Sequence, residues 1–563
     1  MSADRVRKEG WTMVKHRQAY RSRRLLVVSA LLLVATVVVG AARSRPTTTQ
    51  IVSATSAHFA VPSGSIDHLD PGLWYFASTW KLSLATCTPL LTYRDVAGNA
   101  GKVVVGGIAA LPKVTNGGRT YTFQIKPGLK FPDGKPINAA VEKATFDRLF
   151  GKKLASPAVG FFSVITGSQA VADGTAKSVS GITAKGNTLT VHLASPVGSF
   201  EKRMTVPWTC PVPIGSAAGA TENGSLLTSG PYVVSKYVPD RSLVLTRNPA
   251  YNAKQLGDRG HFDTINIDIG VDASQAELQI KAGQLDGYLD RLPAASVNQD
   301  LTDPALKGRI FLNPTPSVSY LWMNNDVAPF NNVKVRQAVN YAINRNAILR
   351  VWGGRSQGQI TDQILPPTMG GFHDVQIYPA NGDLTKAKAL IKASGIKLPV
   401  STTLRTRSDA PGFLQMAQAV QSELKAIGFN VSIKSAPDSV NGGVISTRAS
   451  KVPMGINNWT QDYPDGDDFF LPLLDGEKIT PTNNNNYASF NNPSVVRQIN
   501  KNIALLGSAR DQAWASLDVS TMRNFAPWAP LNNPTWVDLI SSHVSGYVYT
   551  PVYGLDLTTL RPK

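Results

Sequence analysis

Four carboxylates lie close to an aromatic pair in the C-terminal part of the chain. Asp462 follows Trp459 by three residues and directly precedes Tyr463. The other three acidic residues come soon afterwards: Asp465, Asp467 and Asp468. A carboxylate beside aromatic side chains could bind an ammonium group, because a charge buried without a partner costs several kcal/mol. The same residues could instead form a solvated loop, cap a helix beginning at Asp467, or contribute ordinary packing.

Sequence motifs for enzymatic chemistry do not occur in the chain. There is no Gly-x-Ser-x-Gly nucleophile turn, no His-Glu-x-x-His zinc motif and no Gly-x-x-x-x-Gly-Lys-Ser/Thr phosphate loop. The seven histidines are scattered, and no Cys/His pair has the spacing of metal ligands. We therefore expect no enzymatic activity, no metal site and no cofactor. Any coupled ATP hydrolysis would belong to a separate subunit.

Much of the net charge of +19 is concentrated at the N-terminus. Residues 1–46 contain ten Lys/Arg and two acidic residues, and an apolar run extends from Leu25 to Ala41 within them. A basic segment followed by an apolar run is the layout of an export signal. The body would lie outside the cytoplasm, because the basic flank stays inside. The body itself has no block of basic residues, so we expect no nucleic-acid binding.

The leader leaves several alternatives open. Val39-Gly40-Ala41 could be a cleavage site, but the 17-residue apolar run could also remain as an N-terminal membrane anchor. Residues 22–24 (SRR) are a weak match to a twin-arginine signal, so export could follow the Sec or the twin-arginine route. Met13 could be the true start. A lipid-modified cysteine is excluded, since no cysteine directly follows the run.

Cys87 and Cys210 are the two cysteines of the chain, and both lie in the body. In an exported protein such a pair is most simply a disulfide. Two separate buried thiols are the alternative.

The spacing of apolar residues changes along the body. Alternation of apolar and polar residues predicts strands near 121–125, 189–193 and 243–245. After about residue 330, apolar stripes predict helices near 335–343, 384–394 and 413–427, with strands near 398–404 and 431–433 between or after them. Asp383 is expected to cap a helix that ends at Gly395. The pattern indicates a strand-rich first half and an α/β second half.

A series of segments, in order along the chain, resembles one family. The segments are 120–123 (TYTF), 129–136 (LKFPDGKP), 229–232 (SGPY), 247–251 (RNPAY), 282–287 (AGQLDG), 329–338 (PFNNVKVRQA), 341–345 (YAINR) and 459–465 (WTQDYPD). Together they resemble the extracytoplasmic solute-binding proteins of peptide-type ABC importers, family 5, the oligopeptide-, dipeptide- and nickel-binding group. The chain departs from typical members in lacking a lipid-anchoring cysteine after the leader.

The resemblance implies an α/β protein with the two-lobed, type II periplasmic-binding-protein-like fold, an extra subdomain in lobe I, and a ligand cleft between the lobes. We expect a basic segment at 1–24, an apolar segment at 25–43, a linker at 44–56, lobe I at 57–313 plus 526–563, and lobe II at 314–525. The two crossings between lobes are expected near 313–318 and 520–528.

The resemblance also implies a set of ligand-binding residues. In peptide-binding members an acidic residue of the tryptophan-containing segment meets the α-ammonium group of the ligand, and Asp462 is the matching residue. The remaining candidates are the aromatic residues Trp459 and Tyr463, the lobe I residues Trp74, Tyr75 and Ser78, and Arg407. Arg407 would pair with a ligand carboxylate, as in some dipeptide receptors; a surface arginine is the alternative.

The function implied is that of a monomeric receptor that binds a peptide or peptide-like ligand outside the membrane. Its location would be the cell surface, the periplasmic space or the medium. Its partners would be the permease and ATPase subunits of an ABC importer. An exported sensor or chaperone of the same fold is the alternative. The sequence leaves the ligand open among peptides of any length, a sugar, a nickel chelate and an antibiotic-like peptide.

Overall fold

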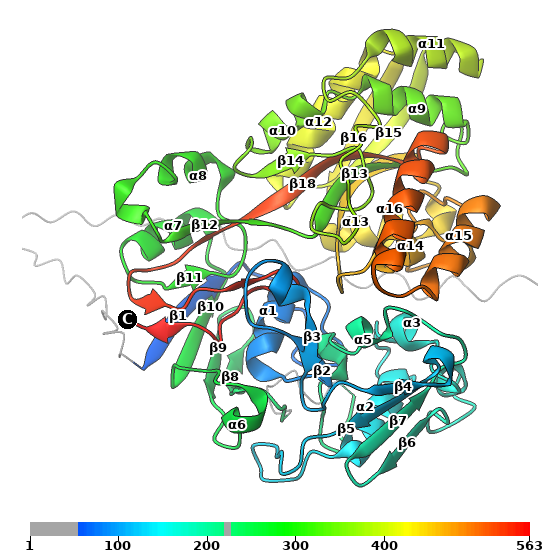
Figure 1. Cartoon of the computed structure of the whole chain (residues 1–563). Helices are drawn as coiled ribbons and strands as arrows, with labels where there is room; N and C mark the ends of the chain where they lie inside the picture. Colours follow the sequence, from blue (N-terminus) through cyan, green and yellow to red (C-terminus); the bar gives the residue numbers. More distant parts are fainter. Residues whose placement is uncertain (1–54, 219–226) are drawn as a thin grey trace, which may run out of the picture. The chain divides into compact units, whose positions relative to one another are not determined.

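The chain was examined as a computed structural model, which describes residues 55–218 and 227–563. The expected leader, its cleavage site and most of the linker lie outside these residues. Within the described ranges, no helix combines the length and the hydropathy needed to cross a membrane. Figure 1 shows the described chain as several sheets with helices packed against them.

A five-stranded sheet forms the base of the first lobe. Its strand order is β11 (Gly287–Tyr288), β1 (Ser56–Val61), β10 (Thr264–Ile269), β9 (Ser242–Arg247) and β8 (Tyr232–Val238). On one face, Phe59 and Ile267 pack with residues of α1 (Ala77–Thr86). On the other face, Ala60 packs with α7 (Ala273–Lys281) and α8 (Ala294–Asp300). Along β9 and β10 buried residues alternate with less buried ones, because these two strands bury only the face that packs with α1.

An antiparallel four-stranded sheet forms a subdomain of the first lobe. Its order is β4 (Lys113–Thr115), β5 (Thr120–Gln124), β7 (Thr188–His192) and β6 (Ile182–Lys185). Tyr121 and Phe123 of β5 pack in a core with Leu189 and Val191 of β7, which confirms both predicted strands. The neighbouring elements are β2 (Leu91–Tyr93), β3 (Val104–Gly106), α2 (Ala139–Phe150), α3 (Val159–Phe162), α4 (Ser168–Ala172), α5 (Phe200–Arg203) and α6 (Ala253–Leu256).

A disulfide joins two distant segments of this lobe. Cys87, the residue at the C-terminal end of α1, is bonded to Cys210, with 5.8 Å between their Cα atoms. Both residues are buried in the subdomain core. The bond therefore ties α1 to the segment that follows α5.

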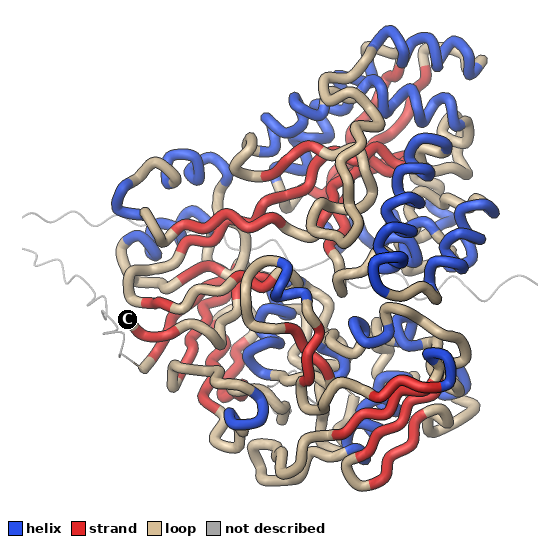
Figure 2. The backbone as a smooth tube through the Cα atoms, viewed as in Figure 1, coloured by secondary structure: helices blue, strands red, loops and turns tan. Residues whose placement is uncertain are grey.

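A seven-stranded sheet forms the second lobe. The order along it is β12 (Ile310–Pro314), β18 (Trp528–Leu539), β13 (Ser317–Met323), β17 (Met454–Thr460), β15 (Val400–Arg407) and β16 (Phe429–Ala436), and β14 (Gly358–Ile360) pairs with β18. Leu321 and Met323 of β13 face one core, while Tyr320 and Trp322 face another. Each face is therefore covered by its own layer of helices, which Figure 2 shows in blue beside the red strands.

The two helix layers come from different parts of the second lobe. The first layer consists of α9 (Val333–Ala342), α10 (Arg345–Trp352), α11 (Leu384–Ser394) and α12 (Pro411–Lys425). The second consists of α13 (Asp438–Ile445), α14 (Asp467–Leu474), α15 (Pro493–Ile503) and α16 (Gly507–Asn524). The predicted caps of α11 are confirmed: Asp383 accepts a hydrogen bond from the Lys386 amide, and Gly395 ends the helix with φ of +73°.

Strand β18 connects the second lobe to the first. Its beginning pairs with β13, and Ala529 and Leu531 pack in the second-lobe core. Its end pairs with β12, and Ile540 then bridges to Gly287 of the five-stranded sheet. The passage therefore lies after residue 531, later than the expected crossing near 520–528 and the expected boundary at 526. In the expected crossing, α16 ends at Asn524 and β18 begins at Trp528, and Arg336 of α9 donates to the carbonyls of Phe525 and Ala526 between them. The chain therefore stays in the second lobe there.

The C-terminal tail returns to the first lobe. It contains the short strands β19 (Val544–Ser545), β20 (Tyr549–Thr550), β21 (Gly554–Leu555) and β22 (Arg561–Pro562). Leu555 and Leu557 pack against the five-stranded sheet, and Tyr553 packs in the subdomain core. The β20–β21 hairpin thereby lies next to α1, and Figure 1 shows these segments together.

Candidate functional site

Asp462 lies in a short turn between a strand and a helix of the second lobe. Strand β17 ends at Thr460, and the Gln461 amide still donates to the carbonyl of Pro316 at 3.0 Å. Helix α14 begins at Asp467, which is one of the alternatives for the acidic run. The Asp462 amide donates to Oδ2 of Asp468, in the first turn of α14, at 2.7 Å. The turn is thus fixed at both ends, which holds the Asp462 side chain in place.

Asp462 is a buried carboxylate without a cationic partner. Only 8% of the residue is exposed, and its Oδ2 atom is buried and accepts no hydrogen bond from the described residues. Burial raises the pKa of Asp462 to about 7. Burial, followed by the charge of Asp462, also raises the pKa of Asp468 well above its usual range. A cation that reached Asp462 would supply the missing charge and donor together.

Asp465 and Asp467 have the opposite environment, since both belong to a buried ion-pair network. Nη2 of Arg510 lies 2.8 Å from Asp465 Oδ1 and 2.8 Å from Asp467 Oδ2. From α5 in the first lobe, Lys202 contacts Asp465 and Arg203 contacts Asp467, each at 2.9 Å. Burial alone would raise the pKa of Asp465, but the charges of Lys202 and Arg510 outweigh it and hold that pKa below its usual range.

The acidic cluster is therefore not a solvated loop. Asp465 and Asp467 are neutralised by basic side chains and join the second lobe to the first. Within the described part of the chain, no basic side chain comes within 4.0 Å of Asp462 or Asp468. Asp462 Oδ2 and Asp467 Oδ1 are both buried without a hydrogen-bond partner among the described residues, but Asp467 is neutralised through its other oxygen by Arg203 and Arg510. Asp462 has no such cation in the described ranges.

Tyr75 borders the same region from the first lobe. Its ring stacks on Trp208, with centroids 6.0 Å apart and planes 9° apart. Burial, followed by the charges of Asp462 and Asp468, raises the pKa of Tyr75 well above its usual range. The residue nevertheless remains 38% exposed. Tyr75 is therefore a partly exposed aromatic side chain of the first lobe in the electrostatic environment of Asp462.

The other first-lobe candidates have structural contacts. Trp74 is buried, and its carbonyl accepts hydrogen bonds from the indoles of Trp208 at 2.7 Å and Trp80 at 3.3 Å. Ser78 is buried, and its hydroxyl donates to the carbonyl of Ser65. These contacts fix the segment that carries Tyr75 and leads into α1, so both residues position Tyr75.

The two aromatic candidates of the second lobe differ in exposure. Tyr463 is 2% exposed and packs in the subdomain core against Phe161, with ring centroids 6.2 Å apart. Trp459 is half-buried at the end of β17, and its Nε1 atom is buried with no hydrogen-bond partner among the described residues. Tyr463 therefore contributes to packing between lobes, whereas the indole N–H of Trp459 lies on the side of Asp468 and opposes the rise in the pKa of that carboxyl.

Arg407 is already paired with acidic side chains. Its Nε atom lies 2.9 Å from Asp409 Oδ1, its Nη1 atom lies 3.6 Å from Asp438 Oδ2, and its guanidinium lies 5.5 Å from the ring centroid of Phe413. The structure thus places Arg407 at the end of β15 in an ion-pair cluster of its own.

Several aromatic residues that pack around Tyr75 and Trp208 could not be identified from the sequence. Trp208, Phe161 and Tyr553 reach the region from three distant segments and belong to no recognised motif. Sequence separation hides such a cluster, because the contacts appear only after the two lobes and the C-terminal tail have folded together. A search for aromatic residues near the disulfide cysteines could have singled out Trp208.

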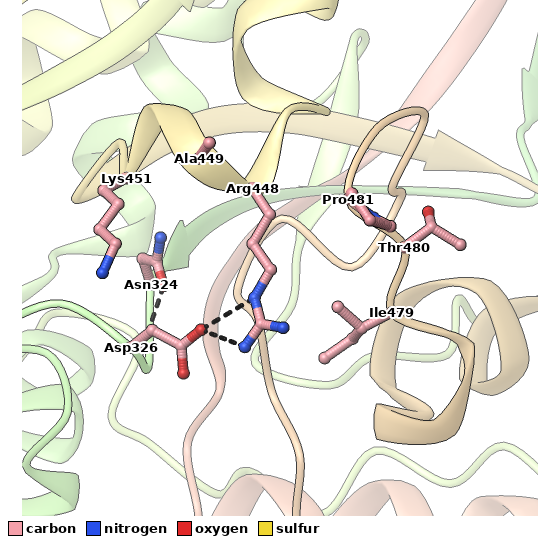
Figure 3. A pocket seen from close by; sticks show the side chains of 8 residues that line it. All are labelled: Asn324, Asp326, Arg448, Ala449, Lys451, Ile479, Thr480 and Pro481. Carbon is pink, nitrogen blue, oxygen red and sulfur yellow. Dashed lines mark hydrogen bonds and ion pairs between the residues drawn. The ribbon is translucent and has the colours of Figure 1, made fainter.

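A separate, open pocket of about 700 Å³ lies on the second lobe. Figure 3 shows its lining, which includes Asn324, Lys451, Thr480 and an Arg448–Asp326 ion pair. None of the residues expected to bind ligand lines it. In the described ranges, no group of three or more His, Cys, Asp or Glu side chains could hold a metal ion.

Comparisons with known proteins agree on one family. Residues 103–481 match the family model described as the middle region of the bacterial extracellular solute-binding proteins, family 5. The probable D,D-dipeptide-binding periplasmic protein DdpA of Escherichia coli is 25% identical over 540 residues, which cover 90% of this chain and 96% of that protein. Heme-binding protein A of Haemophilus influenzae is 30% identical over 337 residues, but the match spans only 58% of each protein.

Solved structures show the same fold. The clavulanic acid biosynthesis oligopeptide binding protein 2 superposes with a TM-score of 0.84 at 24% identity, covering 90% of this chain and 95% of that one. The murein tripeptide binding protein MppA of Escherichia coli gives a TM-score of 0.73 at 22% identity, covering 90% and 98%. The predicted two-lobed α/β fold is thus confirmed, and with it the family resemblance. The chain belongs to family 5 of the bacterial extracellular solute-binding proteins.

Proposed function

We propose that this chain is the extracytoplasmic receptor of an ABC importer and that it binds a peptide or peptide-like ligand by its free α-ammonium group. It acts by binding, without chemical turnover, and hands the ligand to permease and ATPase subunits. The relatives of this chain support the proposal, since they include a probable D,D-dipeptide-binding protein and a dipeptide-binding protein of Escherichia coli. Export by the Sec or twin-arginine route, with the leader cleaved or kept as an anchor, completes the proposal.

The observation that carries the proposal is the state of Asp462. A buried carboxylate with an unpartnered oxygen is unfavourable unless a proton or a cation satisfies it. Tyr75 leaves open surface beside it. A peptide ammonium offers three N–H donors and one positive charge, which match a carboxylate next to the hydroxyl of a tyrosine.

The test compares peptides that differ only in the ammonium group. An equimolar library of di- to pentapeptides with free N-termini is offered to the ligand-free protein, alongside the same library N-acetylated, and retained members are identified by mass spectrometry. Calorimetry on a retained peptide then compares the parent protein with Asp462→Asn. We expect the acetylated library to be retained poorly and Asp462→Asn to weaken binding by about 10- to 100-fold, the range for hydrogen bonds to charged groups.

Asp326→Asn is the matched control. Asp326 is also an aspartate of the second lobe, but it pairs with Arg448 in the open pocket of Figure 3. Its substitution should leave affinity unchanged. Unchanged affinity in Asp462→Asn, or equal retention of free and acetylated peptides, would remove the ammonium group from the proposal.

A further inference from the structure

Two cations share one aromatic ring on the first-lobe side of the protein. The Lys81 Nζ atom of α1 lies 3.6 Å from the ring centroid of Trp536. The guanidinium of Arg291 lies 5.0 Å from the same centroid and 5.7 Å from that of Trp352. Lys81 is 4% exposed, and Arg291 is half-buried. Like charges gathered on one ring repel each other, so this arrangement favours an added negative charge.

Neither cation is neutralised by an ion pair. The two carboxylates that attract Lys81 most are Asp538 and Asp290, yet no carboxylate of the described residues lies within 4.0 Å of Lys81 or Arg291. Asp538 is occupied by neutral donors, namely the hydroxyl of Tyr547 at 2.7 Å and the indole of Trp536 at 2.9 Å. Burial lowers the pKa of Lys81 to about 8, which leaves it mainly protonated at neutral pH.

The cations also have unused hydrogen-bond donors. Lys81 donates to the carbonyl of Leu289 at 3.1 Å, and Arg291 donates to the carbonyl of Thr535 at 3.2 Å. An ammonium has three donors and a guanidinium five, so most remain. The Thr535 amide in turn donates to the carbonyl of Gln357, whose side-chain Nε2 atom is buried without a partner among the described residues.

We call Lys81, Arg291 and Trp536 the cationic recess. Its polar side chains offer N–H donors and two positive charges, while Trp536 supplies an apolar wall. A carboxylate accepts several hydrogen bonds and carries one negative charge, so it complements this set. An ammonium or a neutral amide would lack the charge that the two cations need.

The cationic recess and Asp462 are connected by the same two elements. The segment leading into α1 places Tyr75 beside Asp462, and α1 itself carries Lys81. The β20–β21 hairpin contributes one tyrosine to each site. Burial raises the pKa of Tyr549, which lies close enough to Arg291 for the charge of Arg291 to oppose this rise. Burial also raises the pKa of Tyr553, between the two strands, and the charge of Asp462 adds to the rise. Gly554 lies between Lys81 and Tyr549, since a Cβ atom there would be 3.2 Å from Lys81 Cε and 3.5 Å from the Tyr549 ring.

We propose that the cationic recess binds a carboxylate of the ligand, with Lys81 and Arg291 as its partners, so that the ligand is a small zwitterion held by its ammonium at Asp462 and its carboxylate here. This rests on the proposed function for the ammonium end only. The carboxylate end stands on the contacts of Lys81 and Arg291. Arg407, the arginine expected in this role, is instead committed to Asp409 and Asp438.

The test uses the peptide library in four forms: free acid, C-terminal amide, N-acetyl acid and N-acetyl amide. Retention by the ligand-free parent protein is measured for each form, and affinities are measured by calorimetry on one retained sequence. We expect the free acid to bind at least 10-fold more tightly than its amide. In Lys81→Met the preference for acid over amide should fall below about threefold, because a partner of the carboxylate is lost.

Lys126→Met is the matched control, since Lys126 also donates to a single carbonyl, that of Gln255 at 2.9 Å, outside the recess. It should keep the preference for acid. Acid and amide of equal affinity in the parent would overturn the cationic recess while leaving the ammonium site intact. If N-acetylated acids bind with the same affinity as free acids and the amides do not bind, the result would support the recess and refute the ammonium site. A Lys81→Met protein that folds and keeps the full preference would overturn the recess; if it does not fold, the acid–amide comparison in the parent decides.

Discussion

The backbone amide of Asp462 donates to Oδ2 of Asp468 at 2.7 Å, so one buried carboxylate fixes the turn that presents another. The two acids then share a region that burial makes unfavourable for charge. Asp468 receives a backbone donor, whereas the Oδ2 atom of Asp462 receives none from the described residues. The pair is therefore arranged so that Asp462 takes up a proton or a ligand cation.

Ligand affinity should rise with pH between about 5.5 and 8. Burial raises the pKa of Asp462 to about 7 in the ligand-free protein, and only the ionised form pairs with an ammonium group. Binding below pH 7 should therefore release a proton from Asp462. Calorimetry at pH 6 in two buffers of different ionisation enthalpy measures this release. In Asp462→Asn the release from this site should vanish, and equal affinity of the parent at pH 5.5 and 8 would contradict the prediction.

The free energy of unfolding of the ligand-free protein should also depend on the protonation of Asp462. Because the pKa of Asp462 is raised on folding, its protonated form stabilises the folded state below the unfolded value of about 4, and this contribution is lost as pH rises to about 7. The free energy of unfolding of the parent should thus fall, relative to Asp462→Asn, by roughly 2–4 kcal/mol between pH 4 and 7.

Urea unfolding of both proteins across this range measures the difference. Asp518 and Glu423 also have pKa values raised to about 7 by burial, so the parent alone cannot assign the effect. Subtracting the curve of Asp462→Asn cancels their contribution, since both groups are present in the two proteins. Parallel curves would show that Asp462 has an ordinary pKa.

Loss of Arg203 should destabilise the protein strongly. Its Nη2 atom lies 2.9 Å from Asp467 Oδ2, and both side chains are buried between α5 and α14. Arg203→Met leaves Asp467 with Arg510 alone in a site closed to water, and removing one partner of a buried pair costs about 3–5 kcal/mol. Denaturant unfolding measures the loss.

Arg247→Met is the control for this substitution. Arg247 and Asp263 are 3.9 Å apart and largely exposed, at 50% and 61% of their side-chain surfaces. Exposed pairs contribute about 0–1 kcal/mol, so this variant should unfold close to the parent. Similar losses in the two variants would mean that the buried network contributes no more than a surface ion pair.

The sequence predicts the second lobe better than the site. Helices α9, α11 and α12 are amphipathic, and Asp383 and Gly395 mark the boundaries of α11 without knowledge of the fold. The strands around Tyr121 and Leu189 are visible for the same reason, since each buries one face. The passage of β18 between lobes has no such signal, because its residues are buried in both lobes and show no break in pattern.

The site depends on tertiary ion pairs, and the sequence alone does not show which residues form them. Asp462 and Asp465 stand three residues apart in one acidic run, and composition gives no reason to separate them. Only the arrival of Lys202 and Arg510 from other segments neutralises Asp465 and leaves Asp462 unpaired. Likewise, Lys81 is one of many lysines until Trp536 packs beneath it. Charge pairing across lobes is a tertiary property, and it decides which of similar residues can meet a ligand.

Breaking the Cys87–Cys210 disulfide should weaken both the fold and the recess. The bond closes a loop with a sequence separation of 123, so its loss gives the unfolded chain much conformational freedom and should cost about 2–4 kcal/mol. Cys87 also holds the C-terminal end of α1, the helix that carries Lys81 and follows Tyr75. Reduction should therefore lower ligand affinity as well, at temperatures where the protein stays folded.

Guanidinium unfolding with and without reductant, and of the Cys87→Ala/Cys210→Ala double variant, measures the first effect, and calorimetry measures the second. The oxidised protein should show no reactive thiol even when unfolded, and two after reduction, because the chain has two cysteines. Free thiols in the unreduced protein would refute the bond. An affinity that is unchanged in a folded, reduced protein would show that packing of the subdomain core alone holds α1 in place.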